Sequence, residues 1–156
     1  MYKKITKRIT KIKRKKMNIS IAESCTGGML AQYITSISGS SKVFTFGVVT
    51  YSNQSKIKYL NVPHKIIKKY GAVSEECCNS MLKGLAKISK TKLNLAITGI
   101  AGPNGGTKKK PIGLVYIGIK KNKKIKISKF FFKNQNRDTI RKRSVYKSLE
   151  LIKEFI

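Results

Sequence analysis

The alternation of short β-rich runs with helical segments constrains the fold of this chain more than any other feature of its sequence. Strands that alternate with helices are typical of a layered α/β domain. Two further β-rich runs flank a turn near Asn122 and indicate a hairpin, which adds antiparallel strands. We therefore predict an α/β domain whose sheet is mixed rather than purely parallel.

The pattern predicts strands over 18–22, 43–50, 93–98, 112–119 and 125–132, and helices over 1–16, 29–37, 53–60, 63–70, 75–88 and 138–155. Ser74 has the character of an N-cap, because two acidic residues follow it. The helix after Ser74 should turn its apolar side chains inward, namely Met81, Leu82, Leu85 and Ile88. The length of 156 residues is that of one domain.

The first sixteen residues differ from the rest, since they hold nine Lys or Arg and no acid. Tyr2, Ile5, Ile9 and Ile12 recur at helical spacing and define one apolar face. An organelle transit peptide or a membrane-surface helix has a similar composition. We favour a basic amphipathic helix over 1–16 that packs its isoleucines on a second part of the same single domain, 17–156.

Thirty-five basic residues against six acidic ones give a net charge of +29, which suggests an acidic partner. Only five of the 35 are arginine, the residue that specific readers of phosphates and bases use most. Lysines occur in every segment rather than along one stripe. We interpret the lysines as solvent-exposed surface residues that cause non-specific, salt-sensitive adhesion to polyanions. We expect no specific nucleic acid and no membrane as partner.

The thiols and the single histidine limit the chemistry. Cys25, Cys77 and Cys78 form no even disulfide framework and suit a reducing, cytoplasmic location. With His64 as the only histidine and no C-x-x-C motif, we expect no metal and no cofactor. No apolar run approaches the roughly 18–20 residues that span a bilayer.

Two glycine-rich loops, 23–28 and 98–106, follow predicted strands. Ligands of open α/β sheets bind at the carboxyl ends of strands, and glycine allows the backbone to approach them closely. Neither loop has the pattern of a P-loop or of a dinucleotide-binding turn. Together they predict one shared site for an anionic or polar ligand.

Few side chains in the sequence could act as a general base. His64 lies in a polar helix start, and among the six acids only Glu23 lies in a glycine-rich loop. A hydroxyl paired with a lysine is the remaining option, because burial can lower a lysine pKa far enough for it to act as a base. Lys56 is the candidate, since the run 50–53 leads from a strand end directly into its helix.

Six motifs occur in order: AESCTGG at 22–28, GSS at 39–41, VTYSN at 49–53, GAVSE at 71–75, TGIAGP at 98–103 followed by GG at 105–106, and KPIG at 110–113. Over about residues 17–155 the chain resembles the CinA carboxy-terminal domain family, the PncC-type nicotinamide mononucleotide deamidases. The resemblance implies a three-layer α/β/α sandwich with a mixed, mainly parallel sheet. It also implies a cytosolic amidohydrolase that converts nicotinamide mononucleotide to nicotinic acid mononucleotide and ammonia in pyridine nucleotide recycling.

The resemblance further implies a serine–lysine mechanism without metal. Ser41 is our first choice of nucleophile and Ser24 the second, with Lys56 as the base. Tyr51 would assist proton transfer, and Thr98 and Gly99 would donate hydrogen bonds to the oxyanion. The residues expected to bind the nucleotide are Glu23, Thr26, Gly27, Gly28, Gly99, Gly102, Gly105, Gly106, Arg137 and Arg141, with the phosphate held by one of the two arginines.

The chain departs from the family at two points. It lacks the larger molybdopterin-binding-like domain, so we expect no activity tied to that domain. Gln135 and Asn136 stand where the family commonly has Gly-Asp or Gly-Ser before Arg137. Two other interpretations stay open: a catalytically silent module that binds nucleotides or nucleic acid, and a structural subunit whose basic helix docks on an acidic partner. Self-assembly into a homo-oligomer is also left open.

Overall fold

Five strands form one sheet in the computed structural model, which describes residues 2–156 apart from the side chains of Tyr2 and Lys4. β1 (Ile19–Glu23), β3 (Leu93–Gly99) and β4 (Leu114–Lys121) are the inner strands and are mostly buried. β2 (Phe44–Val49) and β5 (Lys124–Phe131) are the edges and are largely exposed. The inner strands carry apolar residues on both faces, as expected for strands covered on both sides.

The strand order is β2-β1-β3-β4-β5. β1 pairs in parallel with both β2 and β3, whereas β4 pairs antiparallel with both β3 and β5. Four strands therefore point the same way and β4 alone is reversed. This confirms the predicted mixed, mainly parallel sheet, with its late hairpin.

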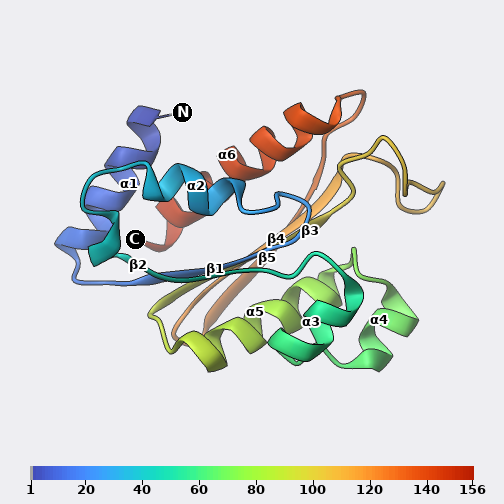
Figure 1. The fold of residues 1–156 in the computed structure, drawn as a ribbon, viewed down its shortest axis with the longest axis horizontal. Coiled ribbons are helices and arrows are strands. Elements are labelled where there is room, and N and C mark those ends of the chain that lie inside the picture. Colours follow the sequence, from blue (N-terminus) through green and yellow to red (C-terminus); the bar gives the residue numbers. More distant parts are fainter. Residues whose placement is uncertain (1) are drawn as a thin grey trace.

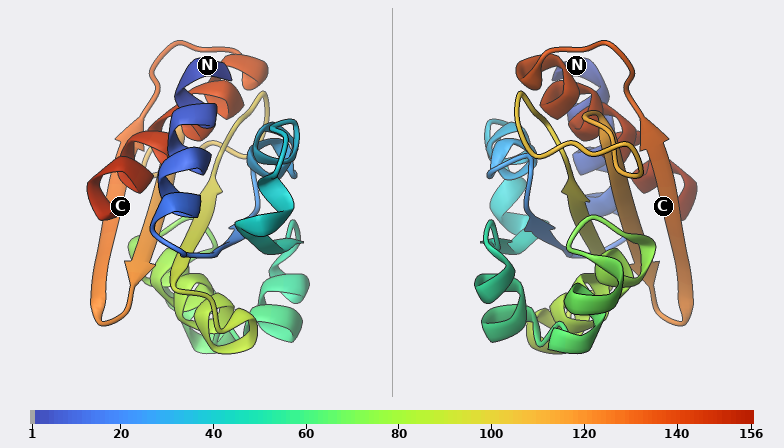
Figure 2. Two further views of the ribbon diagram at one scale, coloured as in Figure 1. Left: turned by 90° about the vertical axis from the view of Figure 1, so that its left-hand side faces the viewer. Right: turned by 90° about the vertical axis from the view of Figure 1, so that its right-hand side faces the viewer.

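Helices cover both faces of the sheet (Figure 1). One face carries α1 (Tyr2–Arg14), α2 (Met29–Thr35) and α6 (Arg137–Phe155). The other face carries α3 (Asn53–Leu60), α4 (His64–Tyr70) and α5 (Glu75–Ser89). Figure 2 shows the two helical layers on either side of the strands, which confirms the three-layer α/β/α sandwich.

Each helical layer buries its own apolar cluster against the sheet. Ile5, Ile9 and Ile12 of α1 are buried in the first cluster, while the predicted place of Tyr2 beside them lies outside the described side chains. In α5 the prediction holds for Met81, Leu82 and Leu85 but is wrong for Ile88, which is exposed near the end of the helix. Among the helices of residues 2–156, none has both the length and the apolar character needed to cross a bilayer.

The second layer is held together by a very close contact between α5 and the end of α3. A Cβ atom placed on Gly84 of α5 would lie 1.8 Å from the carbonyl oxygen of Leu60, which no real structure tolerates. Glycine is thus required at position 84 because the backbone of α3 occupies the space of a side chain. This contact fixes α3 relative to the sheet.

We predict that Gly84→Ala destabilises the protein, although alanine favours a helix over glycine by about 1 kcal/mol. Overpacking of this kind costs about 1–3 kcal/mol or more, because the backbone of α3 must move. Urea denaturation followed by circular dichroism measures the loss. Lys83→Ala, at an exposed position of the same helix, is the control and should leave the midpoint nearly unchanged. Equal midpoints for the two variants would contradict the close packing.

Candidate active site

Ser24 and Lys56 form a buried pair at the carboxyl end of the parallel strands. Ser24 follows β1 directly, and Lys56 lies in α3, whose N-cap Ser52 accepts a hydrogen bond from the amide of Ser55. The Lys56 Nζ is 3.0 Å from the Ser24 Oγ. Lys56 is only 1% exposed and Ser24 7%. The loop after β2 therefore carries the lysine amine to the serine hydroxyl, away from bulk water.

Two main-chain carbonyls complete the surroundings of the Lys56 amine. Its Nζ donates to the oxygen of Thr50 at 2.8 Å and to that of Tyr51 at 3.4 Å. The ion pairs formed within residues 2–156 do not include Lys56. Burial lowers the pKa of Lys56 below its ordinary value of 10.5, while the neighbouring thiols of Cys77 and Cys25 act in the opposite direction. A neutral amine here can donate both hydrogens to the two carbonyls and offer its lone pair to the Ser24 hydroxyl.

A cavity of about 230 Å³ opens beside this pair. Its wall comes from both glycine-rich loops, from the segment after β2 and from the start of α6. The lining residues are Ser24, Cys25, Tyr51, Gly99, Ile100, Ala101, Gly102, Asn104, Gly105 and Arg137. The expectation that both loops meet at one site is thus met by their placement around one cavity.

Gly99 offers a main-chain donor to this cavity. Just beyond the β3–β4 ladder, the Ile100 amide donates to the carbonyl of Leu114, so the backbone groups of Ile100 face the β4 side. Pairs alternate along an antiparallel ladder, so the preceding pair of Gly99 and Val115 is not hydrogen-bonded. The amide of Gly99 consequently points to the β1 side of β3, where Ser24 lies. A side chain at 99 would collide with β4, since its Cβ would lie 2.8 Å from the Leu114 oxygen.

Arg137, at the first turn of α6, ties the mouth of the cavity together. Its Nη1 donates to the Gly102 oxygen at 2.7 Å and its Nη2 to the Tyr51 hydroxyl at 2.8 Å. The Tyr51 hydroxyl thus accepts a hydrogen bond from Arg137, and within residues 2–156 it forms no hydrogen bond with Ser24 or Lys56. Arg141 lies one turn further along α6 and donates to the Thr26 oxygen at 2.8 Å. It supports the first loop from outside the cavity wall.

Glu23 has a different place from the one expected of a nucleotide-binding residue. Its carboxylate accepts the amides of Gly28 and Leu30 at 3.1 Å each and that of Ala31 at 2.8 Å. It is 1% exposed and does not line the cavity. The side chain therefore satisfies the free amides at the start of α2 and balances its dipole. This start is closed to a ligand phosphate.

Other nominated residues also lie behind the cavity wall. The Thr98 hydroxyl donates to the Ala72 oxygen at 2.8 Å and is not directed at an oxyanion. Thr26 is fully buried. Gly27 and Gly28 have positive φ angles and make the turn into α2. Gly106 lines a separate hollow near Pro111.

Ser41 is not brought to Lys56. It is exposed in the short 3₁₀ turn (Ser40–Lys42) before β2, whereas Ser24 lies beyond the other end of the sheet. In the parallel β1–β2 pair, Ile19 is opposite Phe44 and Glu23 is opposite Val49. At about 3.3 Å per strand residue, the length of β2 alone separates the two serines by roughly 15–20 Å. The same chain therefore pairs Lys56 with Ser24 and not with Ser41.

Several cavity residues were not nominated from the sequence: Cys25, Ile100, Ala101 and Asn104. Each lies inside a nominated loop, so the loops themselves were the available signal. The Thr50 and Tyr51 carbonyls that hold Lys56 are main-chain groups, so their role cannot be predicted from residue types. Among the described residues, no group of three or more His, Cys, Asp or Glu side chains gathers as a metal site.

The fold and the pair together define a class: an α/β sandwich with a serine–lysine pair at the carboxyl ends of its parallel strands. The model of the CinA C-terminal domain matches residues 2–156, and the chain belongs to that family. A CinA-like protein of Endomicrobium trichonymphae is 50% identical over 138 residues, which are 88% of this chain and 32% of that protein. The chain spans about a third of the length of the curated relatives it matches.

Solved structures of the family have the same fold. The competence/damage-inducible protein CihA of Agrobacterium tumefaciens superposes with a TM-score of 0.94 at 35% identity, covering 97% of this chain and 92% of that one. A CinA superfamily protein of Klebsiella pneumoniae 700603 gives 0.92 at 27% identity, covering 98% and 95%.

We predict that Glu23→Gln lowers stability because one of its two accepting oxygens becomes an amide that faces backbone amides. A buried donor left without a partner costs about 1–3 kcal/mol. Thermal unfolding of the variant checks the loss, and Glu76→Gln, at an exposed position in the first turn of α5, is the control. A stable Glu23→Gln protein with an altered nucleotide affinity would instead make Glu23 a ligand-binding residue.

Cys25 lies beside Ser24 in the cavity wall and is a second candidate nucleophile. Burial raises the pKa of its thiol from 9.0 to about 12, which leaves it protonated at neutral pH. We predict that Cys25→Ala keeps activity within about tenfold of the wild type. Turnover of the purified variant measures this, with circular dichroism to verify folding. A folded variant that had lost several orders of magnitude would move the nucleophile to the thiol.

Proposed function

We propose that this chain is an amidohydrolase that deamidates nicotinamide mononucleotide, with Ser24 as the nucleophile and Lys56 as the general base. The observation that carries the proposal is the 3.0 Å contact between the buried Lys56 amine and the Ser24 hydroxyl. Within residues 2–156, Lys56 forms no ion pair with a carboxylate that would keep the amine charged. The family resemblance supplies the substrate. The product would be nicotinic acid mononucleotide, formed in the cytoplasm as part of pyridine nucleotide recycling.

The proposed reaction has two halves. Lys56 takes the proton of Ser24 as its oxygen attacks the carboxamide carbon, and the developing oxyanion accepts the amide of Gly99. Lys56 then returns the proton to the leaving nitrogen, which departs as ammonia and leaves a nicotinoyl ester on Ser24. Water attacks this ester with Lys56 again as base, which releases the acid and restores Ser24. The balance is one amide and one water consumed, one acid and one ammonia formed.

The geometry favours Ser24 over Ser41, our first choice from the sequence, since a general base must lie within hydrogen-bonding reach of the proton it removes. Tyr51 takes a different part from proton transfer in this scheme. Its carbonyl accepts from Lys56, and its hydroxyl accepts from Arg137. It connects the base to the mouth of the cavity.

The cavity suits the reacting end of the substrate. At about 230 Å³ it is smaller than the roughly 300–1,000 Å³ of typical ligand pockets, so it accommodates the pyridine ring while ribose and phosphate reach the mouth. Arg137 is the cation in the cavity wall, and its fork suits a phosphate. Because Glu23 occupies the start of α2, the phosphate depends on Arg137. Binding then exchanges the hydrogen bonds of Arg137 to Gly102 and Tyr51 for bonds to the phosphate.

The alternative of a nucleic-acid-binding module needs exposed aromatic rings on which bases stack. The only dense aromatic run is 130–132. Phe130 and Phe132 stack on one another with centroids 6.1 Å apart, and Phe132 is buried in the core. Phe130 and Phe132 are therefore part of the sheet's packing and Phe131 is the one exposed ring of the run, which favours the enzyme.

We predict that Lys56→Met and Lys56→Arg fold and lose turnover by about 10²–10⁴-fold, the range for removal of a general base. Methionine fills the buried space without an amine, and arginine keeps the charge but does not deprotonate. Release of ammonia and of nicotinic acid mononucleotide by the purified protein, with and without a chelator, measures the activity. Lys58→Ala, on the exposed side of the same helix, should keep full turnover.

The pH profile tests the role of Lys56 independently. A base is active when deprotonated, so wild-type kcat/KM should rise with pH and level off above the lowered pKa of Lys56, below 10.5. Ser24→Ala should lose as much turnover as Lys56→Met, because the two act as a unit. Near wild-type turnover in Lys56→Arg, or in Ser24→Ala, would refute the proposed pair.

A further inference from the structure

A second hollow lies next to the candidate active site, along the second glycine-rich loop. Its volume is about 500 Å³, within the roughly 300–1,000 Å³ of small-molecule sites. Gly105 lines the first cavity, whereas Gly106 lines this hollow. Ile112 also lines the hollow and packs against the loop, since a Cβ atom on Gly102 or on Gly106 would lie 2.8 Å from its side chain. The loop is therefore a thin wall that the cavity and the hollow share.

The lining of the hollow combines an aromatic ring, two amides and positive charge. Phe131, at the end of β5, is 50% exposed. Asn134 and Gln135 follow it in the connection to α6. Each of the two segments that form the hollow adds one lysine, Lys108 after β3 and Lys133 after β5. In Figure 1 the segment after β3 extends beyond the end of the sheet.

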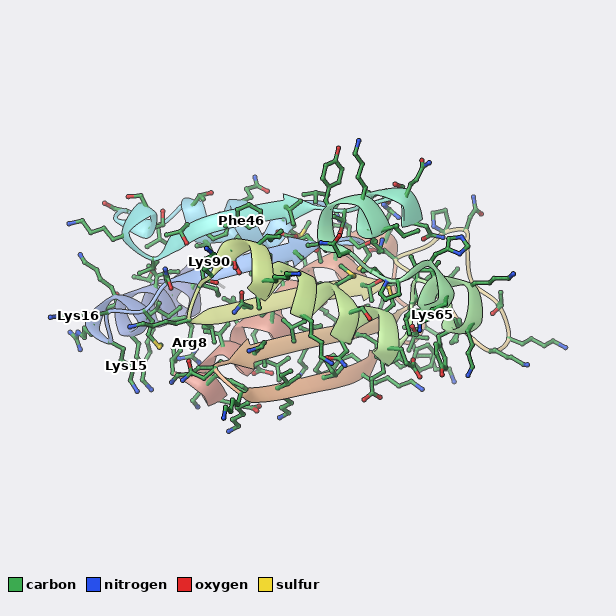
Figure 3. The ribbon with its side chains drawn as sticks, turned by 90° about the horizontal axis from the view of Figure 1, so that it is seen from below. Arg8, Lys15, Lys16, Phe46, Lys65 and Lys90 are labelled. Carbon is green, nitrogen blue, oxygen red and sulfur yellow. The ribbon has the colours of Figure 1, made fainter. Side chains whose placement is uncertain are left out.

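Positive charge alone does not distinguish this hollow, because lysines occur over the whole molecule. Figure 3 shows Lys15, Lys16 and Lys90 toward one end and Lys65 toward the other. The hollow differs in that its lysines lie together with an exposed ring and two amides. None of its lining residues is Asp or Glu. Its composition is therefore suited to an aromatic anion.

The polar groups of the hollow are available to a ligand. Lys108 and Lys133 are exposed and form no ion pair within residues 2–156. Gln135 donates its Nε2 to the Lys133 oxygen at 3.4 Å, and its side-chain oxygen accepts no hydrogen bond from another described residue. The side chain of Asn134 forms no hydrogen bond with another described residue, and it is exposed. A ligand therefore has no internal contact of these lysines to displace.

We propose that this hollow is a subsite for an adenosine phosphate. A nucleobase stacks on an exposed aromatic ring, which Phe131 provides. The amides of Asn and Gln match the N6 and N7 edge of adenine, and lysine supplies a point charge for a phosphate. One exposed ring serves one base, whereas a strand of nucleic acid needs several. The ligand is therefore a nucleotide and not a nucleic acid.

Two kinds of ligand contain this group: a free adenosine nucleotide, and a dinucleotide whose pyridine half lies in the first cavity. Gln135 lines the hollow, and Arg137, two residues further along the chain, lines the cavity. Two residues of chain span at most about 7 Å. The two phosphates of a dinucleotide are directly linked, so a first phosphate on Arg137 brings the second to the edge of the hollow. The dinucleotide rests on the proposed function, whereas the subsite does not.

Titration of the nuclease-treated protein with AMP and with adenosine, followed by ligand-observed NMR, tests the subsite. We expect AMP to bind with a Kd below about 1 mM. Phe131→Ala should weaken both ligands about 5- to 100-fold because the stacked ring is lost, and Phe131→Tyr should restore them. Lys133→Gln should weaken AMP about two- to fivefold and leave adenosine unchanged, because only a contact to the phosphate is lost.

Each variant has a matched control. Phe46→Ala makes the same substitution on the opposite edge strand, β2, where the ring is 36% exposed. Lys123→Gln removes an exposed lysine from the turn between β4 and β5. Both controls should bind AMP as the wild type does. Circular dichroism verifies that all variants fold.

Nicotinamide adenine dinucleotide distinguishes the two kinds of ligand. If it spans both hollows, it should bind at least about tenfold tighter than AMP, because the second contact is intramolecular, and Arg137→Ala should weaken it as Phe131→Ala does. If a free nucleotide is the ligand, the dinucleotide should bind no tighter than AMP and Arg137→Ala should not affect it. Either result supports the subsite.

Three results would overturn the subsite. They are no AMP binding at about 5 mM, AMP binding that Phe131→Ala leaves unchanged, and equal losses of AMP affinity in Lys133→Gln and Lys123→Gln, which would show adhesion to lysines in general. AMP binding by a protein without deamidase activity would leave the subsite standing and refute only the proposed function.

Discussion

The burial of the Lys56 amine is the interaction on which the site depends. Removing an ammonium group from water without a carboxylate to pair with is costly, and a protein avoids much of the cost by keeping the group neutral. Among the described residues, the amine forms its hydrogen bonds with the two carbonyls after β2 and with the Ser24 hydroxyl. α3 is held in this position because Gly84 lets the backbone of α5 approach Leu60, at the end of α3, closely. The packing of α5 against α3 thus keeps the Lys56 amine beside the Ser24 hydroxyl.

The acidic residue nearest to the site has a structural task that determines how an anion could be recognised. In many α/β proteins the helix after the first strand offers its free amides to a phosphate. Here Glu23 already fills that position. A negatively charged substrate must depend on side chains, and Arg137 at the start of α6 is the cation in the cavity wall. Under the proposed function, main-chain and hydroxyl groups would hold the reacting carboxamide, and Arg137 would hold the charged end of the substrate.

The sequence predicts the architecture well because strands and helices have distinct periods and short connections. The same reasoning finds Lys56, Tyr51 and the two glycine-rich loops, since they follow strand ends. It assigns Glu23 to the ligand because a carboxylate in a loop has the same appearance whether it meets a substrate or three amides of its own chain. The family resemblance made Ser41 the first choice of nucleophile, and order along the chain could not correct that choice because it does not say which end of a strand a turn occupies. The register of β1 with β2 decides that point, and it is a long-range property.

The stretch 24–55, whose one charged residue besides the buried amine's neighbours is Lys42, divides by position into parts beside the site and parts away from it. Its first and last parts, around Ser24, Tyr51 and the start of α3, surround a buried amine, and additional lysines there would compete for the same carbonyls and the same substrate. That reason does not apply to the outer face of α2 or to the middle of β2, which face solvent away from the Lys56 amine. Lysine is the commonest exposed residue in the part of the chain that the structure describes, and the site accounts for its scarcity only in the first and last parts of the stretch.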